Sequence, residues 1–445
     1  QPEPAHGRRG KFSVKNVLDM RVCLAGIEIV QIKMRRCVEY FEYLIALLVA
    51  DAFLAKLLSA LEIDDATVGI ISSFITLAFT VQILSVLLCR RRMNSKKIST
   101  VLNCVGHLLF IFLYLTPFLP FRGTGVKLIV MGIILASYAM RYLVATIVFR
   151  WANSFVDPNC RADFSAKKEI ISLLCGMAFT ASVGYIFGRF ESAGKMETGF
   201  LVIAILVLVL NVANFICFLC IGKEEIPEDR EVCGMREVLR ETLGNRNFRS
   251  VIYMTVLWEM GRYFTVGFVG IYKTKDLAIS LFVIQIVNIC GDAMRAILSR
   301  PFGKLSDKTS FAHGIEIALG IAAAAFLCLM FTSPSMWFLI IPYTVLYAVC
   351  LAGVSANSFN ISYSYVRSDC IAEAMAIKNC IGGLCGFGAS LLGSRILAYI
   401  QGNGNRFLGI EVRGQQVLAV CSLIFIVAAF LVTHFVIGRQ KALKQ

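Results

Sequence analysis

The 445-residue sequence lacks the short motifs by which nucleotide-driven pumps and hydrolytic enzymes are recognised. It has no Gly-x-x-x-x-Gly-Lys-Ser/Thr loop to hold the phosphates of ATP, so ATP does not drive this protein directly. Neither His-x-x-x-His nor Gly-x-Ser-x-Gly occurs, and His107 and His434 stand isolated. An intramembrane enzyme needs a clustered metal set or an activated nucleophile, and is therefore a remote alternative.

Charged residues are also scarce, at 16% of the sequence, whereas hydrophobic residues make up 58% and the mean hydropathy is +0.73. An ordinary soluble domain does not have this composition. Twelve apolar stretches are each long enough to cross a bilayer as a helix, which takes roughly 20 residues, and a helix satisfies its own backbone groups there. They lie at 38–61, 67–89, 98–118, 127–149, 168–189, 198–222, 249–272, 278–299, 312–332, 336–358, 376–399 and 416–438.

One charged segment divides these stretches into six and six. The sequence thus predicts an all-α membrane protein with no separate soluble domain large enough to hold an activity of its own. We expect an N-terminal cytoplasmic segment whose first ten residues resemble linker sequence, two six-helix bundles, a cytoplasmic linker between them and a short cytoplasmic tail. The N-terminal segment covers 1–37, the two bundles cover 38–222 and 249–438, the linker covers 223–248 and the tail covers 439–445.

The net charge of +15 is distributed unevenly between the two sides of the predicted membrane. Of the 44 Lys and Arg, 30 fall on the side that holds both termini and the linker, and 8 fall on the other side. Positive loops mark the cytoplasmic side, so both termini are predicted to be cytoplasmic, and the basic loops to touch lipid headgroups rather than nucleic acid. We expect a multi-pass protein of the bacterial inner membrane.

None of the 16 cysteines falls in a loop of the less basic side. Reduced thiols that act as small apolar residues are the natural interpretation. We expect no metal site and no cofactor.

A loop after the eighth stretch carries the most specific motif. Gly303, Leu305, Asp307, Lys308 and Ser310 match the Gly-x-Leu-x-Asp-Arg/Lys-x-Gly/Ser loop of the major facilitator superfamily, which this chain therefore resembles. The first half keeps only the basic end of the motif, at Lys96 and Lys97. In the fourth stretch, Arg141 resembles that family's fourth-helix arginine.

The resemblance implies two bundles that rock about a central site and expose it to each side in turn. A carboxylate at the cytoplasmic end of a helix can accept hydrogen bonds from a neighbouring helix and pair with a base. Gly303, Asp307 and Lys308 are thus candidates for a gating loop that holds one state closed. The alternative is that Asp307 only caps a helix.

Two ionisable residues stand alone in the first half. Asp51 lies near the middle of the first stretch and Arg141 in the fourth, and neither has a charged helical neighbour. Intramembrane charges are costly and usually face a cavity or a partner. The resemblance places helices one and four along the cavity, so we expect the two to pair or to share a solvated pocket. Asp51 is then a candidate protonation site, and a fixed structural ion pair is the alternative.

In the second half, Glu259 and Arg262 are three residues apart, as are Asp292 and Arg295. This spacing places each pair on one helix face, where a local salt bridge lowers the burial cost. The functional alternative is a polar wall that binds solute, with Glu259 as a further coupling candidate. Its other members would be Arg141, Trp258, Tyr263, Gln285, Asn288, Asn357 and Asn360.

Four glycines in the eleventh stretch, Gly382, Gly383, Gly386 and Gly388, follow no strand and are predicted to let helices pack closely. The combined interpretation is a monomeric secondary transporter that imports a small polar, anionic solute with protons. An exporter of drugs or metabolites by proton antiport is the main alternative. A channel is a remote one.

Overall fold

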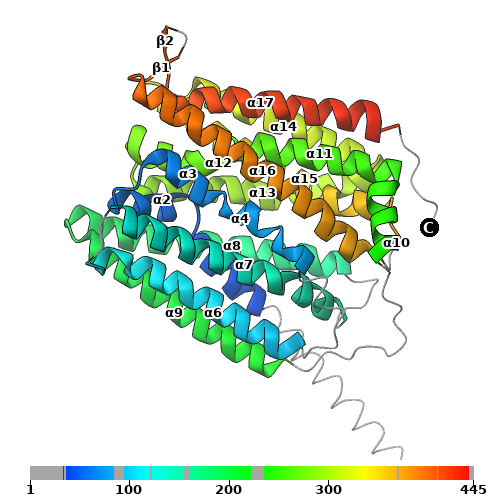
Figure 1. Ribbon diagram of the computed structural model, residues 1–445, viewed down its shortest axis with the longest axis horizontal. Helices are drawn as coiled ribbons and strands as arrows, with labels where there is room; N and C mark the ends of the chain where they lie inside the picture. Colours follow the sequence, from blue (N-terminus) through cyan, green and yellow to red (C-terminus); the bar gives the residue numbers. More distant parts are fainter. Residues whose placement is uncertain are drawn as a thin grey trace, which may run out of the picture.

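Long helices make up most of the computed structural model (Figure 1). The structure describes residues 34, 37–84, 95–120, 123–154, 161–221, 235–367, 370–407 and 409–439. In these ranges the only strands are β1 (Arg406–Phe407) and β2 (Ile410–Glu411), which form an antiparallel hairpin.

The first half begins with a bent span, in which the helix Cys37–Leu48 and α2 (Asp51–Ala60) meet at 42°. A second span, Asp65–Leu84, contains α3 (Asp65–Ser72) and α4 (Phe74–Ala78). The remaining elements are α6 (Ser95–Leu115), the 3-10 turn η1 (Thr116–Phe118), α7 (Thr124–Ser154), α8 (Arg161–Ser192) and α9 (Met196–Cys220).

The linker contains α10 (Met235–Leu239) and the π-turn η3 (Arg240–Gly244). The second half continues with α11 (Arg246–Tyr263), α12 (Val266–Ile271), η4 (Tyr272–Asp276), α13 (Leu281–Lys308), α14 (Phe311–Phe331) and η5 (Trp337–Leu339). It ends with α15 (Ile340–Tyr363), α16 (Ile371–Gly402), α17 (Gly414–Val432) and η6 (Thr433–Ile437).

Ten of the described helices are long and apolar enough to cross a membrane, and the bent first span makes eleven. The predicted seventh span, 249–272, is not among them. It breaks between α11 and α12 at Phe264 and Thr265, and α11 carries Glu259 and Arg262 in its apolar stretch. By length and composition, the described residues therefore give eleven spans and not the predicted twelve, because the seventh segment is short and polar.

Two hydrophobic cores hold the helices together. One contains only residues between Val238 and Ile437. The other is built from residues between Ile45 and Val207, joined by Ile271, Leu281 and Ile284 of the second half. Burial of such side chains stabilises by about 1.5–3 kcal/mol each in water, whereas packing within a bilayer depends on close fit.

The molecule has two ends that we name by what they carry. The "hairpin face" holds β1 and β2, and the "linker face" holds α10; they lie at opposite ends of the helices in Figure 1. Eleven described cysteines are free thiols, as predicted. Cys370 is an exception to the expectation of reduced cysteines, since it is disulfide-bonded.

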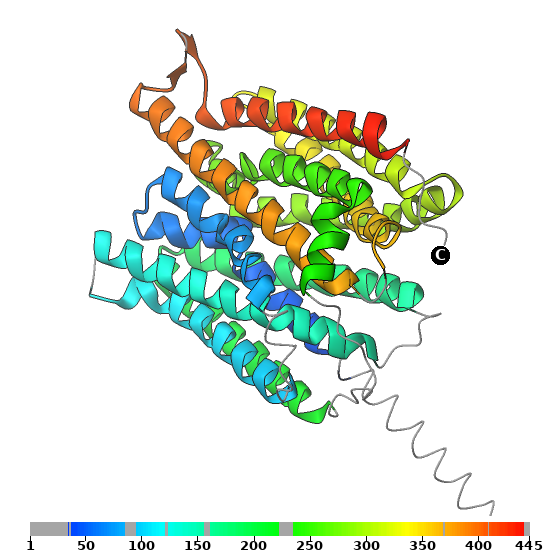
Figure 2. The same ribbon diagram turned by 45° about the vertical axis from the view of Figure 1, so that its right-hand side comes forward.

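The halves meet along a surface that we call the seam. There α16 packs against α3 and α4, α12 packs against α2 and α3, and α13 packs against α8. Figures 1 and 2 show α16, in orange, beside the blue α3 and α4 in both views. Glycines allow this approach: a Cβ on Gly267 would lie 2.8 Å from the carbonyl oxygen of Gly69.

Candidate functional site

A polar contact joins the halves where the first span bends. Asp51 follows the bend with a left-handed φ of 45°. Its carboxylate lies 3.6 Å from the Lys273 Nζ and accepts a hydrogen bond from Asn288 Nδ2 at 3.1 Å. Left-handed backbone in a non-glycine residue costs roughly 1 kcal/mol or more and concentrates at functional positions. The bend therefore directs the Asp51 carboxylate across the seam.

A second polar contact crosses the seam at the hairpin face. The Asp65 carboxylate, 6% exposed, lies 2.8 Å from Lys275 Nζ and accepts a hydrogen bond from Gln401 Nε2 at 2.8 Å. Asp276 lies close by, where Gln415 Nε2 donates to it at 3.3 Å. Burial, and then repulsion from Asp65, raise the pKa of Asp276 above that of an ordinary carboxyl.

Deeper in the seam lies a group of buried and half-buried polar side chains that we call the central cluster. Glu259 and Arg262 of α11 form the predicted i,i+3 pair, 4.0 Å apart. Lys378 of α16 is 2% exposed and interacts electrostatically with Glu259. Its Nζ donates only long hydrogen bonds of 3.3–3.4 Å, to Ser358 and Ser362. The cluster thus holds two cations and one carboxylate.

The first half completes the central cluster with aromatic side chains. Tyr142 of α7 interacts electrostatically with both Glu259 and Arg262. The Phe79 ring meets Tyr142 edge-on at 4.8 Å. Tyr347 of α15 lies beside Arg262. Helices from both halves therefore surround the same polar groups.

Three buried atoms of this cluster lack a hydrogen bond of good geometry to any described residue, although Tyr347 and Arg262 are close enough to interact: Glu259 Oε2, Arg262 Nε and Tyr347 Oη. Leaving such a group unsatisfied costs about 1–3 kcal/mol, and more when it is charged. Unsatisfied buried polar groups indicate strain or an additional binding partner. A small polar solute between the halves would satisfy them.

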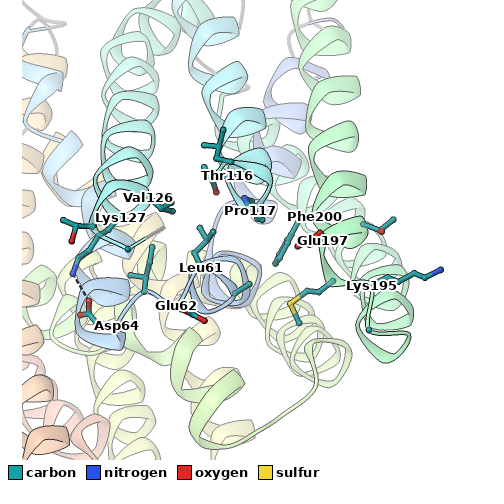
Figure 3. Close-up of a pocket in the computed structure, with 18 residues that line it drawn as sticks. Leu61, Glu62, Asp64, Thr116, Pro117, Val126, Lys127, Lys195, Glu197 and Phe200 are labelled. Carbon is teal, nitrogen blue, oxygen red and sulfur yellow. Dashed lines mark hydrogen bonds and ion pairs between the residues drawn. The ribbon is translucent and has the colours of Figure 1, made fainter. Parts of the chain in front are cut away.

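A cavity of about 660 Å³ lies elsewhere, at the hairpin face of the first half (Figure 3). Leu61, Pro117 and Phe200 are among its walls, and the Asp64–Lys127 ion pair of 2.7 Å lies at its edge. It is lined only by residues of the first half, so it does not face the central cluster.

A model of the family described as MFS/sugar transport protein matches residues 101–359, which is more than half of the chain. The chain belongs to the major facilitator superfamily. It is a multi-pass membrane transporter and not an enzyme. A search of curated proteins gives no match to this transporter.

Solved structures share the fold of this transporter. A structure of the nucleoside transporter NupG has a TM-score of 0.67 at 12% identity, covering 91% of this chain and 99% of that one. A bacterial homologue of the human lysosomal transporter Spinster gives 0.61 at 17% identity, covering 94% and 98%. An inward-facing bacterial homologue of the iron transporter ferroportin gives 0.63 at 14% identity, covering 94% and 100%. At these identities the likeness concerns the fold alone.

The expected pairing of Asp51 with Arg141 is wrong in this structure. Asp51 contacts Lys273 and Asn288 instead, because the 42° bend turns it toward the second half. Arg141 lies against α6, where a Cβ on Gly106 would be 3.6 Å from the Arg141 Cγ. The two candidates therefore occupy different environments within the transporter.

The residues of the polar wall predicted in the second half lie in separate places in the structure. Trp258 is 4% exposed within the core of that half, and Asn357 donates to the Gly353 carbonyl oxygen at 2.8 Å. Gln285, 4% exposed, packs against Gly184 of α8 in the seam. These side chains contact helix neighbours in this structure, and their role in solute binding remains a prediction.

Other candidates keep local partners. Asp292 interacts electrostatically with Arg295 on α13, as the spacing predicts. Tyr263 is 4% exposed and packs against Gly386, whereas Asn360 is exposed. Tyr263 lies next to Arg262 in the chain, and the Arg262 guanidinium lies 5.0 Å from the centre of its ring.

The predicted gating loop ends α13. Lys308 is exposed and is the last residue of that helix. Ser310 accepts a hydrogen bond from the His313 backbone N–H at 3.1 Å and so caps α14. The Asp307 side chain lies outside the described residues. The role of Gly303, Asp307 and Lys308 in gating remains a prediction.

Proposed function

We propose that this transporter imports a small polar solute with negative charge, together with protons, and that its linker face is cytoplasmic. The central cluster carries the proposal. In it, Arg262 and Lys378 both interact with the single carboxylate of Glu259, where the two halves meet. An excess of one positive charge in a low-dielectric site favours an anion, with which Arg forms paired hydrogen bonds.

Glu259 is the proposed proton site. Its Oε2 makes no hydrogen bond to the described residues, and its nearest basic groups belong to the same cluster. When an anionic solute binds Arg262 and Lys378, it competes with Glu259 for their charge. Loss of that stabilisation favours the neutral form of Glu259, so solute and proton bind together.

Contacts across the seam near the hairpin face support a state that faces the linker side. Asp51 with Lys273, and Asp65 with Lys275 and Gln401, join the halves near that face. We infer that these contacts form in this state and break when the opposite side opens. Asp51 then serves the conformational change.

A neutral polyhydroxylated solute is the second candidate. Tyr142, Tyr347 and Phe79 provide aromatic faces at the central cluster, and such faces suit sugars or nucleosides. The matched family and the fold neighbour NupG carry these solutes in their descriptions. Export by antiport would use the same cluster, with the proton gradient acting in the opposite sense.

The test uses the full chain. A thermal-shift screen compares carboxylates, sugar phosphates, sugars and nucleosides, and the most stabilising compound is then followed as a radiolabel in proteoliposomes. Glu259→Gln should abolish accumulation driven by a pH gradient while exchange of internal for external solute continues. Glu316→Gln is the control, since among the described residues Glu316 pairs with His313 and His434, away from the seam. Saturable uptake that ignores the gradient in the unmodified protein would refute proton coupling.

A further inference from the structure

One face of α6 carries a row of buried polar side chains that the proposed function does not use. Ser99, Asn103 and His107 recur every four residues and are 0%, 2% and 0% exposed. At a rise of about 1.5 Å per residue, the row extends roughly 12 Å from the linker end of the helix toward its middle. Polar groups at such depth in a bundle usually have a function.

Neighbouring helices add polar groups at the same levels. Glu42 of the first span accepts a hydrogen bond from Asn103 Nδ2. Asn211 of α9 donates to the Cys104 carbonyl oxygen at 3.3 Å, and Asn214 lies one turn nearer the linker face. We call this set the polar column; its members are Glu42, Ser99, Asn103, His107, Asn211 and Asn214.

The inner end of the polar column meets Arg141. His107 interacts electrostatically with Arg141 of α7 and lies beside Asn211. Arg141 also interacts with Tyr142, which belongs to the central cluster. The outer end lies near the linker face, where Lys96 Nζ donates to the Leu219 carbonyl oxygen at 2.9 Å. The column therefore extends from near the linker face to Arg141, whose chain neighbour Tyr142 belongs to the central cluster.

Five buried atoms of this column lack a hydrogen bond of good geometry to any described residue, although His107 and Asn211 are close enough to interact: Ser99 Oγ, His107 Nδ1, His107 Nε2, Asn211 Oδ1 and Asn214 Oδ1. Each would cost about 1–3 kcal/mol if it stayed unsatisfied. Five such atoms in one narrow region exceed what a well-packed bundle tolerates without a further partner. The partner must be small, donate and accept hydrogen bonds, and fit between helices.

We propose that a chain of bound water molecules fills the polar column and connects the linker face with Arg141. A buried water makes about three hydrogen bonds to otherwise unsatisfied polar groups. A neutral imidazole offers one donor and one acceptor, so His107 can orient a water on each side. Glu42 and Arg141 are the charged groups that face the chain from the first span and from α7.

The chain also provides a path along which protons leave the central cluster for the cytoplasm. This role rests on the proposed proton coupling, whereas the presence of water does not. A proton entering at one end is passed from water to water, and an equivalent proton leaves at the other, so no net chemical change occurs.

The first experiment maps water directly. Radiolytic hydroxyl-radical labelling of the full chain in nanodiscs, read by mass spectrometry, should modify His107 about tenfold faster than Phe110 after correction for intrinsic reactivity, because only His107 would contact bound water. Phe110 is the matched control, being 0% exposed on the same helix but within the apolar core. Equal rates at the two residues would overturn the proposal.

The second experiment tests continuity with the linker face. In a background without reactive cysteines, Asn214→Cys should react with a small cationic methanethiosulfonate added at that face. Val207→Cys should not, since Val207 is 0% exposed in the apolar core two turns along α9. His107→Gln keeps a donor and an acceptor and should preserve the reaction. An unreactive Asn214→Cys in folded, monodisperse protein would overturn the connection, and neither experiment depends on solute or on proton coupling.

Discussion

Replacement of Asp65 by asparagine tests whether the polar contacts at the hairpin face hold the two halves together. The Asp65 carboxylate lies 2.8 Å from Lys275 Nζ and accepts a hydrogen bond from Gln401 Nε2 at 2.8 Å. Both partners belong to the second half. The substitution removes the charge but leaves an amide that can still accept from Gln401. We expect the halves to separate more often at this face.

The magnitude follows from exposure. The Lys275 side chain is 58% exposed, so its ion pair with Asp65 is worth no more than about 1 kcal/mol. The charge-assisted bond from Gln401 becomes a neutral one and loses about 1 kcal/mol. Relief of the Asp65–Asp276 repulsion stabilises the closed state and offsets part of this loss. A net change of about 1 kcal/mol lowers the ratio of closed to open molecules about fivefold.

Double electron–electron resonance can count the two populations. Labels at Ser192 and Asn403 lie on exposed ends of helices from different halves at the hairpin face. Asp64→Asn is the control, because Asp64 pairs with Lys127 within the first half at 2.7 Å. Lys275→Gln should shift the distances in the same direction and add little to Asp65→Asn. If the variants at positions 64 and 65 give the same distances, the contacts of Asp65 do not hold the face closed.

Two further predictions concern pH. Burial and Asp65 raise the pKa of Asp276 in the closed state, so acid favours closure: the closed fraction should rise as pH falls through that raised pKa, and Asp276→Asn should abolish the rise in the same resonance measurement. Although burial acts to raise the pKa of Asp64, hydrogen bonds from Lys127 and Thr67 lower it below 3.8. Its contribution to stability is therefore complete above that value and is lost as pH falls through the lowered pKa. Asp64→Asn should cost no more than about 1 kcal/mol near neutral pH and flatten the acid limb of a thermal-unfolding curve.

The fold was largely predictable because hydropathy and span length reflect the bilayer directly. The Gly303–Ser310 motif then indicated the correct superfamily, which the match over 101–359 supports. The seventh span escaped the apolar criterion in the structure because α11 carries the polar residues of the central cluster. The polar residues that keep α11 from being recognised as a membrane span are the same residues that belong to the central cluster.

The site was predictable only where partners are close in sequence. Glu259 and Arg262 share a helix, so their spacing sufficed. Lys378 reaches the same cluster from α16, and Lys273 reaches Asp51 from η4; both contacts depend on how helices pack. In the sequence, Lys273 directly follows the predicted seventh stretch, and His107 is an isolated histidine. Their burial, which the sequence does not reveal, is what distinguishes them.

Two glycines of α16 allow a test of whether the glycines of this helix serve close packing across the seam or helix flexibility. A Cβ on Gly383 would lie 2.4 Å from the Thr76 carbonyl oxygen, whereas a Cβ on Gly388 meets nothing within 4 Å. Backbone cannot move aside as a flexible side chain can, so Gly383→Ala should force α16 away from α4 at a cost of about 1–3 kcal/mol. The same substitution at Gly388 should be neutral or slightly stabilising, because alanine favours helix. We expect Gly383→Ala to lower the melting temperature and transport together, and Gly388→Ala to lower neither. Equal losses in the two variants would mean that helix flexibility, and not the fit of α16 against α4, is what these glycines provide.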